Sequence, residues 1–167
     1  EHTPVKSAEE LFRKMTEKPD GKFELTEDLD ASGIAADKAA AAGTFTGELD
    51  GNGYRIFNLP TSLFGTLSGA YVHDLVIEDA AVTAQRGGIL ADAVRNRTVI
   101  ENVFINDSSI SNSVDGVGGF TGTLSNSTIR KSAAVDVKVR GLVAVGAVAG
   151  KTDSGAPIED CSVSGTV

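Results

Sequence analysis

Three aspartates recur at nearly equal intervals along the chain. Asp79, Asp107 and Asp136 are separated by 28 and 29 residues. If the chain repeats with that period, their carboxylates stack about 5 Å apart on neighbouring repeats, where like charges repel each other. A bound cation would relieve the repulsion, and a polysaccharide-cleaving enzyme could use paired acids of this kind. Aspartate is also favoured at backbone corners because its side chain bonds nearby amides, and we favour that interpretation of this acidic column.

The histidines do not form a recognisable metal site. His2 and His73 are the only two, and they lie 71 positions apart. Zinc catalysis needs about three protein ligands and an open position, and no His-Glu-x-x-His spacing occurs. The sequence therefore predicts no zinc site. His73 follows an inward apolar position of an expected strand, which predicts a solvated histidine on the outer surface.

Two further features could carry chemistry, and each has a structural explanation. Cys161 is the only cysteine, and it aligns with Leu75 and Val103 in the repeat, which predicts a small core residue rather than a nucleophile. The segment 50–53, Asp-Gly-Asn-Gly, alternates oxygen ligands with glycine but lacks the later acidic ligands of a calcium loop. It is interpreted as a glycine turn between two strands. No catalytic, cofactor-binding or metal-binding residue is predicted.

The elements that would position these residues are repeats. Val72, Ile100, Ile129 and Ile158 are spaced by 28, 29 and 29 residues, and apolar positions recur at fixed offsets after each of these anchors. The third position holds Leu75, Val103, Ser132 and Cys161; the fifth holds Ile77, Ile105, Ala134 and Val163; the tenth holds Val82, Ile110 and Val139. Such columns predict an all-β fold, a right-handed parallel β-helix whose stacked strands bury every second side chain. An earlier, incomplete coil is expected with Ile56 as its anchor.

The amino end predicts a helix that covers the open end of the stack. Ser7 and Glu10 have the spacing of a capping box, and Leu11, Phe12 and Met15 share one face. We expect a helix from Ser7 to Glu17, a capping helix and lead-in over 1–22, and the β-helix over 23–167. The small residues 35–42 are expected to form an excursion with a helical turn.

Composition narrows the possible partners. The formal charge is −8, from 23 acidic and 15 basic residues, and no basic stripe could follow a phosphate backbone, which argues against nucleic acid. No apolar run approaches the roughly 20 residues that span a bilayer. Since the pattern could continue beyond Val167, the chain is expected to be a fragment of a longer protein.

Three segments resemble a known family: FELTEDLDASG at 23–33, FTGELDGNGYRIFNL at 45–59 and LFGTLSGAYVHDLVIEDAAV at 63–82. They are similar to the β-helical region of streptococcal IgA-specific zinc metallopeptidases and related surface proteases. The resemblance implies a secreted, cell-wall-attached parent with zinc in its catalytic domain and a host substrate such as immunoglobulin A. Because the family's zinc motif is absent here, no catalytic residue is transferred to this chain.

The sequence thus favours a noncatalytic scaffold that orients its own catalytic domain and helps to dock a protein substrate. Two alternatives stay open. One is a β-solenoid adhesin or carbohydrate-binding module, and the other is a solenoid polysaccharide hydrolase or lyase that uses the acidic column.

Overall fold

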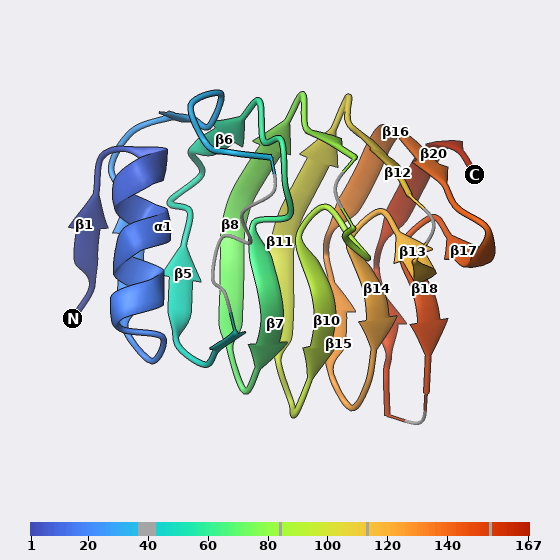
Figure 1. Ribbon diagram of the computed structural model, residues 1–167. Coiled ribbons are helices and arrows are strands. Elements are labelled where there is room, and N and C mark those ends of the chain that lie inside the picture. The colour runs from blue at the N-terminus through green and yellow to red at the C-terminus, as the bar shows by residue number, and fades with distance from the viewer. Residues whose placement is uncertain (37–42, 84, 113, 154) are drawn as a thin grey trace.

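The computed structural model is a parallel β-solenoid of about five turns with one short helix at the amino end, which confirms the predicted fold class (Figure 1). The structure describes residues 1–36, 43–83, 85–112, 114–153 and 155–167. Most of the small-residue excursion expected at 35–42 lies outside these residues. No described helix is both long and apolar enough to cross a membrane.

The strands form three parallel sheets that wrap around one core. The largest sheet has 13 strands: β1 (Thr3–Val5), β2 (Lys22–Leu25), β3 (Leu29–Asp30), β5 (Glu48–Asp50), β6 (Arg55–Phe57), β8 (Tyr71–Glu78), β9 (Ala81–Val82), β11 (Val99–Asn106), β12 (Ser109–Ser111), β15 (Thr128–Arg130), β16 (Ala133–Arg140), β19 (Ile158–Glu159) and β20 (Ser162–Thr166). The second sheet contains β4 (Thr44–Phe45), β7 (Phe64–Ser68), β10 (Ala91–Arg95), β14 (Thr121–Leu124) and β18 (Ala149–Thr152), and the third pairs β13 (Asp115–Gly118) with β17 (Val143–Gly146).

The residues predicted to share a column pair with one another on neighbouring strands of the sheet. Val72 pairs with Ile100, Ile100 with Ile129, and Ile129 with Ile158. The fifth-position column continues in the same way from Ile77 to Val163, and the tenth-position column joins Val82, Ile110 and Val139. The anchors and their column neighbours are fully buried through the middle of the stack, because each coil is covered on both sides.

The early coil is anchored differently from the prediction. Leu49, not Ile56, pairs with Val72, and Ile56 pairs with Ile77 in the fifth-position column. Leu49 and Ile56 are seven residues apart, whereas Val72 and Ile77 are five apart. The two extra residues are accommodated in the glycine turn between β5 and β6, so the sequence spacing alone assigned Ile56 to the wrong column.

The amino-terminal helix α1 (Ala8–Glu17) closes one end of the stack, as predicted (Figure 1). The backbone N–H of Glu10 donates to Ser7 Oγ at 3.1 Å, and the Glu10 carboxylate accepts from the N–H of Lys6 at 2.8 Å. Leu11 and Met15 are fully buried in the common core. Strand β1 pairs in parallel with β2, so the sheet already begins within the segment assigned to the cap and lead-in.

The corners of the coil are built from glycine and from small hydroxyl residues. Gly88 and Gly118 form a parallel bridge, and Gly118 pairs with Gly146 on the next coil. A Cβ atom at Gly88 would overlap the backbone of Thr121, so only glycine fits this close approach. At other corners buried hydroxyls accept backbone N–H groups: the N–H of Ala70 donates to Thr98 Oγ1 at 3.1 Å, and that of Val103 to Ser132 Oγ at 3.1 Å.

Candidate functional site

A column of charged side chains runs along the outer face of the largest sheet, one position after the anchors. Because alternate side chains of a strand point to opposite faces, these residues point away from the core. The parallel register stacks them in the order Glu24, Asp50, His73, Glu101, Arg130 and Glu159. His73 therefore lies between two carboxylate-bearing residues, one on each neighbouring strand.

His73 is held by carboxylates rather than solvated. Its Nε2 lies 2.8 Å from Glu48 Oε2, and its Nδ1 lies 2.7 Å from Asp74 Oδ2 and 3.7 Å from Asp50 Oδ1. The ring stacks on that of Tyr71, with centroids 4.1 Å apart and planes inclined by 17°. Only 11% of the side chain is exposed. The outward orientation was predicted correctly, but the expectation of a solvated histidine was wrong, because the preceding coil supplies Glu48 and Asp50 and the strand of His73 itself supplies Tyr71 and Asp74.

The same contacts shift several protonation equilibria. Burial disfavours a charged ring, but hydrogen bonds to Asp74 and Glu48 outweigh it and raise the pKa of His73 above its ordinary value. Burial also opposes ionisation of Glu48, yet hydrogen bonds with His73 and His2 lower the pKa of that carboxyl. Burial and a 2.8 Å hydrogen bond donated to Glu101 raise the pKa of the Tyr71 hydroxyl to about 12. The cluster thus favours ionised carboxylates and a neutral tyrosine.

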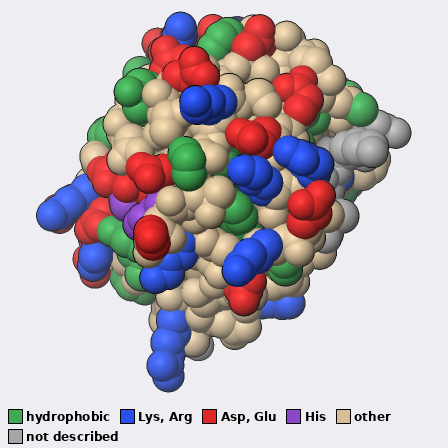
Figure 2. Space-filling view, turned by 90° about the vertical axis from the view of Figure 1, so that its left-hand side faces the viewer, with side chains coloured by type: hydrophobic (Ala, Val, Ile, Leu, Met, Phe, Trp, Pro, Cys, Tyr) green, Lys and Arg blue, Asp and Glu red, His purple; other side chains and the backbone are tan. Residues whose placement is uncertain are grey.

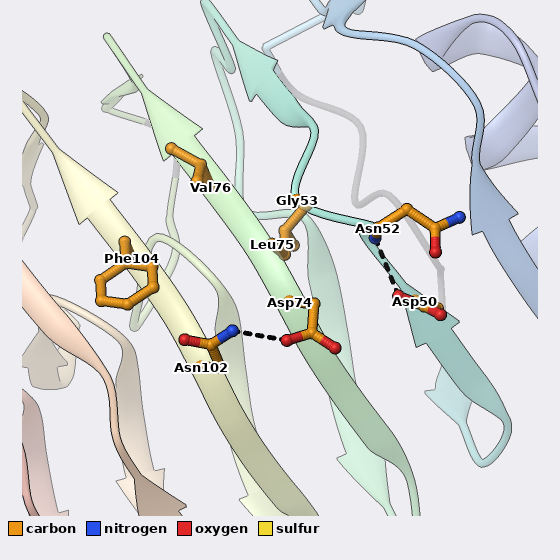
Figure 3. Close-up of a pocket in the computed structure, with 8 residues that line it drawn as sticks. All are labelled: Asp50, Asn52, Gly53, Asp74, Leu75, Val76, Asn102 and Phe104. Carbon is orange, nitrogen blue, oxygen red and sulfur yellow. Dashed lines mark hydrogen bonds between the residues drawn. The ribbon is translucent and has the colours of Figure 1, made fainter.

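Further polar groups fix the carboxylates in place. Asn102 Nδ2 donates to Asp74 Oδ1 at 2.5 Å, and the backbone N–H of Asn52 donates to Asp50 Oδ1 at 2.8 Å (Figure 3). The hydrogen bond from Asn102 is the main reason that the pKa of Asp74 is lowered. His2 Nε2 lies 2.8 Å from the Glu48 oxygen that His73 contacts. Figure 2, which views the amino-terminal end, shows histidine atoms among acidic side chains at the surface.

An open pocket of about 390 Å³ adjoins this cluster. Its lining combines carboxylate and amide oxygens with an apolar wall: Asp50, Asn52, Gly53, Asp74, Leu75, Val76, Asn102 and Phe104 (Figure 3). The predicted glycine turn joins β5 to β6 and forms one side of it. Gly51 has no room for a Cβ atom beside the backbone of Asp74 and Leu75, which brings Asp50 close to the neighbouring strand.

The three aspartates of the acidic column lie at corners of the coil, where the backbone takes positive φ angles. Asp79, Asp107 and Asp136 have φ angles of 54°, 49° and 54°, in the left-handed region that aspartate and asparagine tolerate better than most residues. Asn58 continues the column with φ 62°. In the part of the chain that the structure describes, no group of three ligand-type side chains includes these aspartates. The geometry supports the turn interpretation.

Cys161 is less enclosed than a mid-stack core residue. Its side chain is partly buried and packs against the hydrophobic core, in the column with Ser132. Its Sγ lies 3.1 Å from the carbonyl oxygen of Glu159. Ser132 makes the equivalent contact on the preceding coil, donating at 2.9 Å to the carbonyl of Arg130. Cys161 thus takes the place of a corner hydroxyl residue on the last coil.

Sequence analysis missed the cluster of Glu48, Asp50, His73 and Asp74. A signal for it was present, since assigning Leu49 to the anchor column places Asp50 beside His73. The assignment of Ile56 as the anchor of that coil concealed this neighbour. The contacts made by Glu48 depend on side-chain directions that no column pattern specifies.

Comparison with known proteins supports the family resemblance. Residues 2–106 match the M26 IgA1-specific Metallo-endopeptidase N-terminal region. The chain is 31% identical over 140 residues to an Immunoglobulin A1 protease of Streptococcus sanguinis, and 32% identical to one of Streptococcus pneumoniae, covering 79% of this chain. It spans only 7% of the length of these relatives.

Two solved structures are similar to this chain in fold. A structure named IgA1 Protease matches with a TM-score of 0.76 and 25% identity, over 96% of this chain and 15% of that one. A crystal structure of a Bacteroides ovatus protein, proposed to be an immunoglobulin A1 protease, matches with a TM-score of 0.65 and 18% identity, over 98% and 68% of the two chains, and supports the fold alone. The chain belongs to the M26 IgA1-specific metallo-endopeptidase family and corresponds to part of its N-terminal region.

Proposed function

We propose that this chain is a noncatalytic scaffold and substrate-docking domain of a secreted, cell-wall-associated zinc metalloendopeptidase that resembles the IgA1 proteases. The observation that carries the proposal is the stack of parallel, hydrogen-bonded coils in a chain that belongs to this N-terminal region. In a parallel solenoid each coil is hydrogen-bonded to its neighbours, so the stack behaves as a stiff rod. A stiff rod can hold a catalytic domain and a large substrate at a fixed separation.

The absence of the family's zinc motif is consistent with this role. The sequence holds two histidines, and neither belongs to a His-Glu-x-x-His motif. The residues of this chain therefore do not fit the zinc centre expected in the catalytic domain of the parent. Catalysis is assigned to that domain, and substrate binding is the contribution proposed for the solenoid.

The direct test is binding of the purified chain to human immunoglobulin A by surface plasmon resonance, with a glycan panel in parallel. We expect saturable binding to the immunoglobulin while its heavy chain stays intact on a denaturing gel. Binding to glycans alone would instead identify a carbohydrate-binding module. Cleavage of either ligand by the chain would overturn the noncatalytic assignment, and binding to neither would overturn the docking role.

A second experiment uses the parent protease. Removing this segment should raise KM for intact immunoglobulin A and leave cleavage of a short peptide substrate unchanged, because a docking surface acts only on the large substrate. Equal losses on both substrates would show that the segment supports the catalytic domain rather than docking the substrate.

A further inference from the structure

We propose that Asp50, His73 and Asp74 form a binding site for a divalent transition-metal ion of the zinc type. One ligand atom from each residue, a carboxylate oxygen or a ring nitrogen, can be chosen so that all three lie within 4.8 Å of one another. Three protein ligands with an open position are a common arrangement for zinc in proteins. This inference extends beyond the docking function and concerns a site that the spacing of the two histidines did not reveal.

The separations suit a small tetrahedral ion. Bonds of about 2.0–2.1 Å in tetrahedral geometry place ligand atoms roughly 3.3 Å apart. His73 Nδ1 lies 2.7 Å from Asp74 Oδ2 and 3.7 Å from Asp50 Oδ1, so the two observed separations bracket that value.

The surrounding groups orient the ligands as they do at established metal sites. A metal-binding histidine usually donates its second ring N–H to a carboxylate, which fixes the tautomer. Here Glu48 Oε2 lies 2.8 Å from Nε2 and accepts its N–H, while Nδ1 faces Asp74 and Asp50, so a bound ion would replace the proton that Nδ1 shares with Asp74. Asn102 and the backbone N–H of Asn52 hold one oxygen of each aspartate.

The pocket beside the cluster provides access and room for further ligands. Asp50 and Asp74 both line this open space of about 390 Å³, and 44% of the Asp74 side chain is exposed. Water can therefore complete the coordination shell. An imidazole ligand favours zinc, copper or nickel over magnesium and calcium, and three ligands fall short of the six to eight oxygens that calcium takes.

The test is isothermal titration of the metal-free chain with Zn²⁺, and separately with Ca²⁺ and Mg²⁺. We expect one Zn²⁺ per chain and no saturable binding of the other two ions. His73→Gln should abolish binding, and Asp50→Asn and Asp74→Asn should each weaken it at least about tenfold. Glu48→Gln should weaken it by about 10-fold to 100-fold, because it alters the group that orients the ring.

Matched controls separate this site from other carboxylates and from the second histidine. Asp107→Asn removes one charge from the acidic column and should leave zinc affinity unchanged. His2→Gln should retain binding within about tenfold, because His2 contacts only Glu48 in this cluster. Circular dichroism and urea unfolding of every variant verify the fold, and the two aspartate variants keep the test decisive if His73→Gln does not fold.

Absence of saturable Zn²⁺ binding would overturn the proposal and leave His73 as a ring hydrogen-bonded to Glu48 and Asp74. Unchanged affinity in both Asp50→Asn and Asp74→Asn would also overturn it. So would loss of binding in His2→Gln as complete as in His73→Gln, because the ion would then be held by the amino-terminal segment. None of these outcomes depends on whether the chain binds immunoglobulin A.

Discussion

The two ends of the solenoid carry similar apolar side chains but bury them to different extents. At the amino end, α1 places Leu11 and Met15 in the core, and both are fully buried. At the carboxyl end, Ile158 and Val163 continue the anchor and fifth-position columns, yet they are 41% and 47% exposed. Leu142, which precedes β17 on the coil before, is 78% exposed.

The difference shows that a column position does not determine burial by itself. Ile105 and Val163 belong to one ladder, and Ile105 is fully buried because coils lie on both sides of it. In a stacked repeat each coil is stabilised by its own contacts and by its nearest neighbours. The last described coil has a neighbour on one side only, whereas the first has a helix on its outer side.

The largest effect is expected for a charge in the middle of the stack. Ile105→Asp buries an unpaired carboxylate between two coils and should destabilise the chain by about 4 kcal/mol or more. Urea unfolding followed by circular dichroism would measure the loss. A cooperative transition close to that of the unmodified chain would contradict the assignment of Ile105 to the core ladder.

Shortening the buried face of the cap should have the next largest effect. Leu11→Ala leaves a cavity under α1 and should lower the free energy of unfolding by about 3 kcal/mol. Leu142→Ala is the matched control at the other end, where the side chain is exposed, and should change stability by less than about 0.5 kcal/mol. Similar losses in both variants would mean that the helix does not seal the core as described.

The capping contact of Glu10 at the start of the helix should make the stability of the amino end depend on pH. The hydrogen bond from the N–H of Lys6 is the main cause of the lowered pKa of Glu10, whose ordinary value is 4.5. A lowered pKa in the folded state contributes stability above pH 4.5 that is lost as the pH falls through the folded-state value.

Glu10→Gln should therefore destabilise the chain by about 0.5 kcal/mol at neutral pH, and the difference should shrink below pH 4.5. Thermal unfolding of both proteins across pH 3–7 would measure it. A difference that grows in acid would reverse the assigned sign and exclude the capping contact as its source.

The smallest effect is expected for a charge at the exposed end of the same ladder. Val163→Asp should change the unfolding free energy by less than about 0.5 kcal/mol, because its side chain is already in contact with solvent. When both variants are measured under the same conditions, the difference between the losses in Ile105→Asp and Val163→Asp gives the effect of the coil that covers Ile105. A loss of several kcal/mol at Val163 would show that the end coil is covered in solution.

Much of the architecture could be predicted because an inward strand position must be apolar and recurs once per coil. The columns from Val72 to Val163 were correct for this reason, and so was the helix start at Ser7, where local hydrogen bonds decide the conformation. The anchor of the early coil was wrong because a turn between β5 and β6 contains two additional residues. That error also concealed the charged cluster around His73, because it hid the pairing of Asp50 with that residue.

The sequence by itself determined the period of the coil, the inward columns and the helix that closes one end, since each depends on local spacing and on which side chains avoid water. Only the tertiary structure decided which side chains from successive coils meet. Asp50 and His73 are 23 positions apart in the chain, and the parallel register makes them direct neighbours. Contacts across the stack depend on the length of every intervening turn, and a turn can change length without disturbing the columns.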